Sequence, residues 1–119
     1  MKSYIINPID SSIYSIIKKF DNYSIYHTKQ WHDFLEETFN WKINAIAGYE
    51  NNELCFFLPF VSKRRISLRK INIALPFSHH MGIAINPHYT TKMKEMGGEI
   101  KSKMNRLEIH DKIDYKQFN

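Results

Sequence analysis

The sequence predicts a mixed α/β fold, an α+β arrangement of mostly antiparallel strands flanked by helices, and three observations support it. Apolar residues recur at helical spacing in two segments of the N-terminal third. Two β-prone runs then flank a short Asn-rich turn, which is the pattern of a hairpin. Further alternating runs follow, separated by prolines and glycines. Because 119 residues are enough for one core, we expect a single domain over residues 1–119.

The first helix is predicted from a capping pattern and an apolar stripe. Residues 4–6 are β-prone and predict a strand that leads into it. Asn7 is expected to cap the helix, with Pro8 at its first position and Asp10 favoured by the helix dipole. The expected core-facing stripe comprises Ile9, Ile13, Ile16, Ile17 and Phe20.

The second helix is predicted to begin after Thr28, a good capping residue. Its expected core-facing stripe comprises Trp31, Phe34, Leu35, Thr38 and Phe39. After it, residues 42–49 and 54–60 predict two strands joined by a turn at 50–53.

The remaining elements are predicted from alternation and from breakers. Residues 61–68 are expected to form a basic loop or hairpin tip. We expect strands at 69–75 and 82–85, a helix at 90–104 despite Gly97 and Gly98, and a last strand at 106–110. The tail has few apolar residues, so the fold is expected to be incomplete.

Composition favours a soluble protein of a reducing compartment. The chain is 43% hydrophobic and carries a net charge of +5. Its single cysteine, Cys55, lies in an apolar run and predicts a buried, inert thiol. No run is long enough to span a membrane, and the N-terminal apolar run is too short for a signal peptide. We therefore expect a cytoplasmic location.

Four segments, in this order, carry a resemblance to a known family. They are the Thr-Lys-Gln-Trp-His-Asp-Phe-Leu run at 28–35, the Phe-Leu-Pro-Phe run at 57–60, the basic linker, and the Leu-Pro-Phe-Ser run at 75–78 closed by Gly82. Over about residues 23–110 the chain resembles the N-terminal half of the FemAB-related, GNAT-like N-acyltransferases. The resemblance implies transfer of an acyl or aminoacyl group to an amine of a cell-wall or surface-glycan precursor.

The same resemblance also implies where the acyl donor binds. In such enzymes acyl-CoA or aminoacyl-tRNA is bound mainly by the later half, which has no counterpart here. The Met96-Gly97-Gly98-Glu99 run is a poor phosphate loop, since it has no preceding strand and ends on an acid. We therefore expect no cofactor to be bound by this chain, and no activity from the chain alone.

The candidate catalytic residues are His79 and His80, in the loop that contains Ser78. An imidazole near neutrality can take a proton from an attacking amine or bind a sugar hydroxyl. Ser78 is a candidate substrate contact, since no glycine-flanked turn marks it as a hydrolase nucleophile. The alternative is that one histidine faces solvent and the other satisfies a backbone carbonyl.

The candidate substrate-binding residues are Lys63, Arg64, Arg65 and Trp31. Guanidinium groups bind phosphate oxygens bidentately, so the basic cluster suits a nucleotide-linked or lipid-linked sugar precursor. The alternative is a solvated connection that protects a sheet edge. Trp31 is expected to line the acceptor cleft or, alternatively, to be part of the core. Nucleic acid is disfavoured because the nearby phenylalanines are expected in the core.

Two further expectations complete the functional hypotheses. The six histidines include no pair at i, i+3 or i, i+4 on a predicted helix, so no metal site is expected. A different class, a non-catalytic α/β module that binds an anionic ligand or a protein partner, stays open. An exposed sheet edge would then favour a homodimer.

Overall fold

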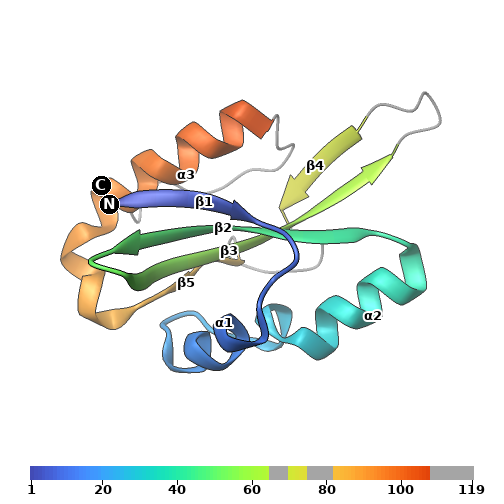
Figure 1. The fold of residues 1–119 in the computed structure, drawn as a ribbon, viewed down its shortest axis with the longest axis horizontal. Helices are drawn as coiled ribbons and strands as arrows, with labels where there is room; N and C mark the ends of the chain where they lie inside the picture. The colour runs from blue at the N-terminus through green and yellow to red at the C-terminus, as the bar shows by residue number, and fades with distance from the viewer. Residues whose placement is uncertain (65–69, 75–81, 108–119) are drawn as a thin grey trace.

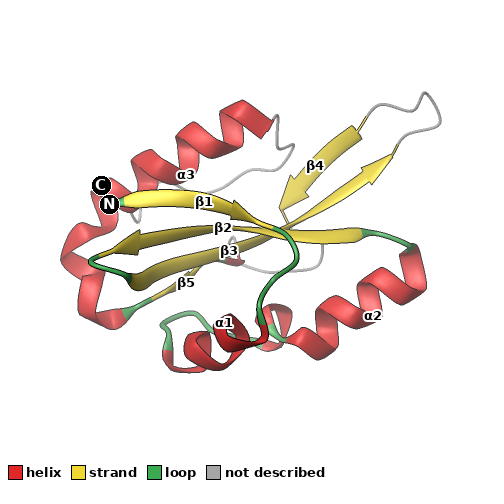
Figure 2. Cartoon of the chain, viewed as in Figure 1, coloured by secondary structure: helices red, strands yellow, loops and turns green. Residues whose placement is uncertain are grey.

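The computed structural model describes residues 1–64, 70–74 and 82–107, which form an antiparallel sheet between two helical layers (Figure 1). The strands are β1 (Lys2–Ile6), β2 (Lys42–Glu50), β3 (Glu53–Arg64), β4 (Lys70–Ala74) and β5 (Ala84–Ile85), and the helices are α1 (Ser11–Ile16), α2 (Lys29–Phe39) and α3 (Met93–Leu107). Helix α3 covers one face of the sheet, and α1 and α2 lie on the other (Figure 2). The predicted mixed α/β class is confirmed.

The long strand β3 organises the sheet. It pairs with β2 along most of its length, and β2 pairs in turn with β1. The first half of β3 pairs with β5 through Phe57 and Ala84, and its second half pairs with β4 through Phe60 and Ala74. Every one of these pairings is antiparallel.

The β2–β3 hairpin is confirmed, including its turn. Asn51 and Asn52 have φ angles of 52° and 63°, the left-handed values that a two-residue hairpin turn requires. Strand β3 is longer than expected, however. Residues 61–64 continue it and pair with β4, so the predicted loop at 61–68 is wrong up to residue 64. Residues 65–69 lie outside the described residues.

A β-bulge in this hairpin decides which side chains face α3. Gly48 pairs with Phe56 and Tyr49 with Leu54, so Cys55 is the extra residue. Cys55 and Phe56 consequently both pack into the cluster beneath α3, with Met96 and Ile100 of that helix. A β-carbon at Gly48 would overlap the Phe56 ring, which explains glycine at this position.

Helix α1 begins later than predicted. Its N-cap is Asp10, whose side-chain Oδ1 accepts from the backbone N–H of Ser12 at 3.0 Å. The predicted start at Pro8, with Asn7 as the cap, is therefore wrong. The cause is local, because aspartate caps as well as asparagine does and here stands three residues nearer the buried stripe. Within the stripe Ile13 is buried, whereas Ile16 is 49% exposed.

Helix α2 begins as predicted, with a different buried face. The Thr28 hydroxyl accepts from the Trp31 backbone N–H at 3.1 Å. Leu35 is buried as expected, but its buried companion is His32, whereas Phe34 and Phe39 are exposed. The expected aromatic stripe is therefore wrong in part, because an imidazole with both ring nitrogens hydrogen-bonded can be buried in place of a phenyl ring.

The C-terminal part also departs from expectation. A 3₁₀ helix at Pro87–Lys92 precedes α3, which buries Met96, Ile100 and Met104. Arg106 and Leu107 complete this helix, so the strand predicted at 106–110 is wrong at its first two residues. Residues 108–119 lie outside the described residues. Among the described helices, none has both the length and the apolar composition needed to cross a membrane.

Candidate functional site

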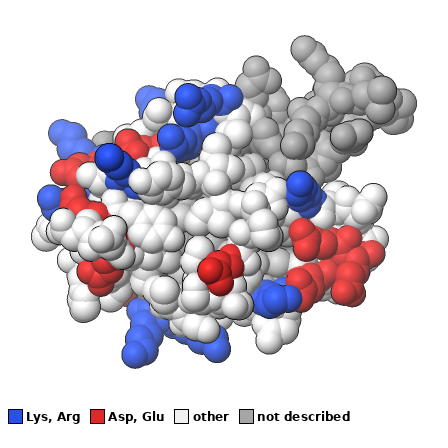
Figure 3. Space-filling view, viewed as in Figure 1, with Lys and Arg blue, Asp and Glu red and all other residues white. Residues whose placement is uncertain are grey.

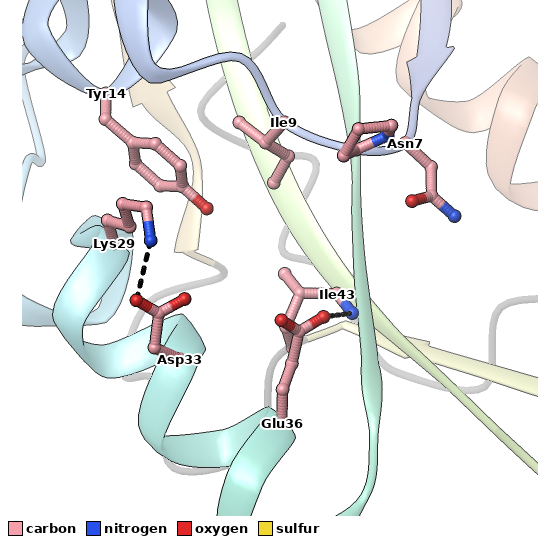
Figure 4. A pocket seen from close by; sticks show the side chains of 8 residues that line it. Asn7, Ile9, Tyr14, Lys29, Asp33, Glu36 and Ile43 are labelled. Atoms are coloured by element: carbon pink, nitrogen blue, oxygen red, sulfur yellow. Dashed lines mark hydrogen bonds and ion pairs between the residues drawn. The ribbon is translucent and has the colours of Figure 1, made fainter.

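A pocket of about 230 Å³ lies between the segment after β1 and helix α2 (Figure 4). Residues 7–9 form one wall, α1 contributes Tyr14, and β2 contributes Ile43. Helix α2 supplies the charged side chains, which are Lys29, Asp33 and Glu36. Four parts of the chain thus meet around one small space, which we call the α1/α2 pocket.

The charged side chains share one side of α2 because they stand at i, i+4 and i+7. Lys29 Nζ lies 2.7 Å from Asp33 Oδ2, and Glu36 Oε2 accepts from the Ile43 backbone N–H at 3.0 Å. Each carboxylate is held through one oxygen and turns the other toward the pocket (Figure 4). The two acids outnumber the one lysine, so the pocket favours a cation.

A buried imidazole stands behind the Tyr14 hydroxyl. His32 Nδ1 lies 2.7 Å from Tyr14 Oη, and His32 Nε2 lies 2.9 Å from the backbone carbonyl oxygen of Tyr26. The residue is 1% exposed. Both ring nitrogens therefore have partners within the protein, and this is what allows the ring to be buried.

These partners fix the direction of each hydrogen bond. A carbonyl oxygen only accepts, so His32 Nε2 carries the proton that is donated to Tyr26. Burial lowers the pKa of His32 to about 4, so near neutral pH its Nδ1 is unprotonated. The Tyr14 hydroxyl must then donate to Nδ1. The oxygen of Tyr14 is left as an acceptor toward the pocket.

Tyr14 also remains protonated. Burial raises its pKa, and the nearby carboxylates of Asp33 and Glu36 raise it further. A tyrosinate is therefore excluded near neutral pH. Tyr14 and the two carboxylates together present hydrogen-bond acceptors, and the ammonium of Lys29 is already paired with Asp33. A ligand that supplies several N–H donors fits this arrangement.

A second buried imidazole anchors the chain beside this site. His27 Nε2 donates to the carbonyl oxygen of Gly82 at 2.7 Å, and its Nδ1 accepts from the Ser24 backbone N–H at 3.0 Å. Burial lowers the pKa of His27, so the ring is neutral in this role. Gly82 has a φ of 64°, a conformation that favours glycine, and it directs its carbonyl to His27. His27 therefore fastens the segment before α2 to the start of β5.

Among the predicted site residues, Trp31 has a described side chain, and it does not line this pocket. His79, His80, Ser78 and Arg65 lie outside the described residues. Lys63 and Arg64 belong to β3, but their side chains also lie outside the description. Trp31 is partly buried and packs near Leu35, on the side of α2 away from Asp33. Its predicted place in an acceptor cleft stays a prediction, and its packing agrees with the alternative of a core residue.

Sequence reasoning overlooked Tyr14 and Glu36 and gave no role to His32. The sequence did contain a signal for the acidic side chains of the site, since Asp33, Glu36 and Glu37 stand at i, i+3 and i+4 of α2, close to Lys29. No local pattern, by contrast, marks Tyr14, because its partner is eighteen residues away.

Other chemistry receives little support from the described residues. Within residues 1–64, 70–74 and 82–107, no group of three potential ligands is placed to hold a metal ion. Cys55 is buried and free, as predicted, and burial raises the pKa of its thiol to about 11. A thiol of this kind is a poor nucleophile near neutral pH.

Comparison of the chain with family models, curated proteins and solved structures found no match. The function of the site is therefore inferred from its own geometry.

Proposed function

We propose that the α1/α2 pocket binds the primary amine of an amino sugar or peptide acceptor, as the acceptor-binding part of an N-acyltransferase. The observation that carries the proposal is the set of acceptors that Tyr14, Asp33 and Glu36 turn toward the pocket, beside the ammonium of Lys29 and the amide of Asn7. The Tyr14 hydroxyl donates its hydrogen bond to His32, so its oxygen can only accept from a ligand, and Asp33 and Glu36 supply carboxylate oxygens. An ammonium group has three N–H donors and one positive charge, which match these groups.

In the proposed reaction the bound ammonium first gives one proton to a base, and the neutral amine nitrogen then attacks the carbonyl carbon of a thioester or ester donor. A C–N bond forms, the C–S or C–O bond breaks, and the thiol or hydroxyl leaves with a proton that the amine loses. The chain's own contribution is to bind and orient the amine, which lowers the entropic part of the barrier. The proposed base is His79 or His80, as the resemblance to GNAT-like enzymes implies, and the donor is acyl-CoA or aminoacyl-tRNA.

The alternative of a module for an anionic ligand is less well supported. It depends on Lys63, Arg64 and Arg65, whose side chains lie outside the description. The charged walls of the described pocket repel an anion, since Asp33 and Glu36 outnumber Lys29. A homodimer through the edge strand β1 also remains a proposal.

Calorimetric titration of the chain with glucosamine and with N-acetylglucosamine tests the proposal. The two sugars differ in that acetylation removes the positive charge. We expect glucosamine to bind at least tenfold more tightly, which corresponds to about 1.4 kcal/mol. Equal affinity for the two sugars, or no binding of glucosamine, would contradict the proposal.

Substitutions then locate the binding. Asp33→Asn and Glu36→Gln keep the shape of the side chains and remove the charges, so each should weaken glucosamine binding about tenfold. Glu37→Gln is the matched control, because Glu37 lies on the same helix but does not line the pocket. Equal losses in all three variants would indicate a general charge effect and not a site.

A further inference from the structure

A row of aromatic rings runs along α2, on the side away from the α1/α2 pocket, and its exposed members are Phe34 and Phe39. Successive ring centroids lie 5.5, 5.4, 6.4 and 4.6 Å apart, in the range of favourable aromatic pairs. The rings belong to Tyr26, Trp31, Phe34, Phe39 and Trp41, which we call the aromatic strip. Two of its contacts are stacked, Trp31 with Phe34 and Phe39 with Trp41.

Stability alone does not explain the strip. Phe34 is 48% exposed and Phe39 is 45% exposed. In the core beneath α3, by contrast, Phe56 and Phe60 are at most 1% exposed. A contiguous exposed apolar surface with charged residues at its border is typical of an interaction site.

The charged residues of α2 are mainly acidic. The helix carries Asp33 and Glu36, which line the α1/α2 pocket, Glu37, which does not, and one basic residue, Lys29, which is paired with Asp33 at 2.7 Å. The space-filling view shows the largest group of acidic side chains on that face of the molecule over the part occupied by α2 (Figure 3). Glu37 lies one turn beyond Phe34, so an acid borders the exposed ring directly.

We propose that the aromatic strip is a docking surface for a basic, amphipathic segment of a partner protein. The apolar side chains of that segment cover Phe34 and Phe39. Its lysines and arginines pair with Glu37 and lie over the ring faces as cation–π contacts. Aromatic residues are also the residues that dominate binding energy at protein interfaces.

The charges argue for this occupant over two others. A nucleic acid is repelled by the acids of α2. The basic helix α3 of a second copy offers lysines, but its apolar residues Met96, Ile100 and Met104 are already buried against its own sheet. A partner segment with both basic and unburied apolar residues meets both requirements.

Tryptophan fluorescence reports directly on this surface, because Trp31 and Trp41 are the two tryptophans of the chain and both belong to the strip. The probe is a synthetic 14-residue amphipathic peptide of leucine and lysine, and its control has glutamate at every lysine. We expect the lysine peptide to change the emission with saturation, and the glutamate peptide to bind at least tenfold more weakly. Salt should weaken the lysine peptide's binding.

Matched variants distinguish specific docking from nonspecific hydrophobic binding of the peptide. Phe34→Ala and Glu37→Lys should each weaken the lysine peptide at least tenfold, with thermal unfolding of the variants measured alongside. Ile16→Ala is the control, since Ile16 is exposed to the same degree, at 49%, but lies on α1. Equal loss in Ile16→Ala, equal binding of both peptides, or no response to the lysine peptide would overturn the proposal.

Discussion

The two faces of the sheet are packed by different chemistry. Beneath α3 the core cluster consists of phenylalanine, isoleucine, leucine and methionine and one buried cysteine, and a hydrogen bond from the Ser3 hydroxyl to Glu99 lies beside it. Beneath α1 and α2 the protein buries His27 and His32 and places the Tyr14 hydroxyl against the second of these rings. Burying polar rings costs free energy unless every nitrogen is hydrogen-bonded, so the second face carries constraints that stability does not require. Apolar clusters on both faces stabilise the fold, and we propose that the α1/α2 face, with its buried imidazoles, carries the function.

The largest effect is expected on the α3 face. Phe56→Ala removes a fully buried ring from the cluster and should lower the free energy of unfolding by about 3 to 5 kcal/mol. Denaturant unfolding followed by circular dichroism measures it. Ile25→Ala, at a residue that is 64% exposed, should change the stability by less than about 1 kcal/mol. Similar losses at both positions would contradict the assignment of the main core to this face.

The second-largest expected effect is a loss of folding stability at acidic pH, which arises from the α1/α2 face. The pKa of His32 is lowered from 6.5 to about 4 by burial, so between these values the unfolded chain binds a proton that the folded chain does not. Stability is therefore complete above about pH 6.5 and falls as the pH drops toward 4. The loss should reach roughly 3 kcal/mol. His27 contributes in the same direction, because its pKa is also lowered.

Unfolding curves between pH 7.5 and 4 measure this slope. His32→Gln keeps one donor and one acceptor for Tyr26 and Tyr14 but does not titrate, so it should flatten part of the slope. Ile25→Ala is the control, since this side chain is 64% exposed and has no titratable group, so the slope should stay unchanged. A slope that His32→Gln does not alter would contradict the burial of a neutral imidazole.

Alanine substitutions at two glycines on the α3 side should have smaller and opposite effects on stability. Gly48→Ala should destabilise the protein by about 1 to 3 kcal/mol, because the new methyl group meets the buried Phe56 ring. Gly98→Ala should stabilise it by up to about 1 kcal/mol, since Gly98 lies in α3 with open space around it. Thermal unfolding of the two variants measures the opposite signs. Stabilisation by Gly48→Ala would show that the ring can move aside.

The fold was predictable where local chemistry decides it. Asn51 and Asn52 favour the left-handed conformation, so the hairpin and its turn followed from the sequence. Thr28 likewise identified the start of α2. The buried face of α2 could not be predicted, because the burial of His32 depends on Tyr14 and on the Tyr26 carbonyl, which the folded chain alone brings together.

The candidate site was less predictable than the fold. Trp31 attracted attention as an aromatic residue, but it lies on the side of α2 away from the pocket that holds Asp33 and Glu36. Tyr14 carried no local signal, since its role comes from the packing of α1 against α2. The roles proposed for His79 and His80 remain predictions, outside the described residues.

The most direct test of this account is the protonation state of His32, read from the imidazole ¹⁵N chemical shifts of the labelled protein at pH 7. The account predicts a neutral ring with the proton on Nε2 and a bare Nδ1 that accepts from Tyr14. The Tyr14 oxygen is then an acceptor toward the pocket, as amine binding requires. A proton on Nδ1 would leave the Tyr14 hydroxyl free to donate to a ligand, and that result would contradict the acceptor role of Tyr14 in the pocket.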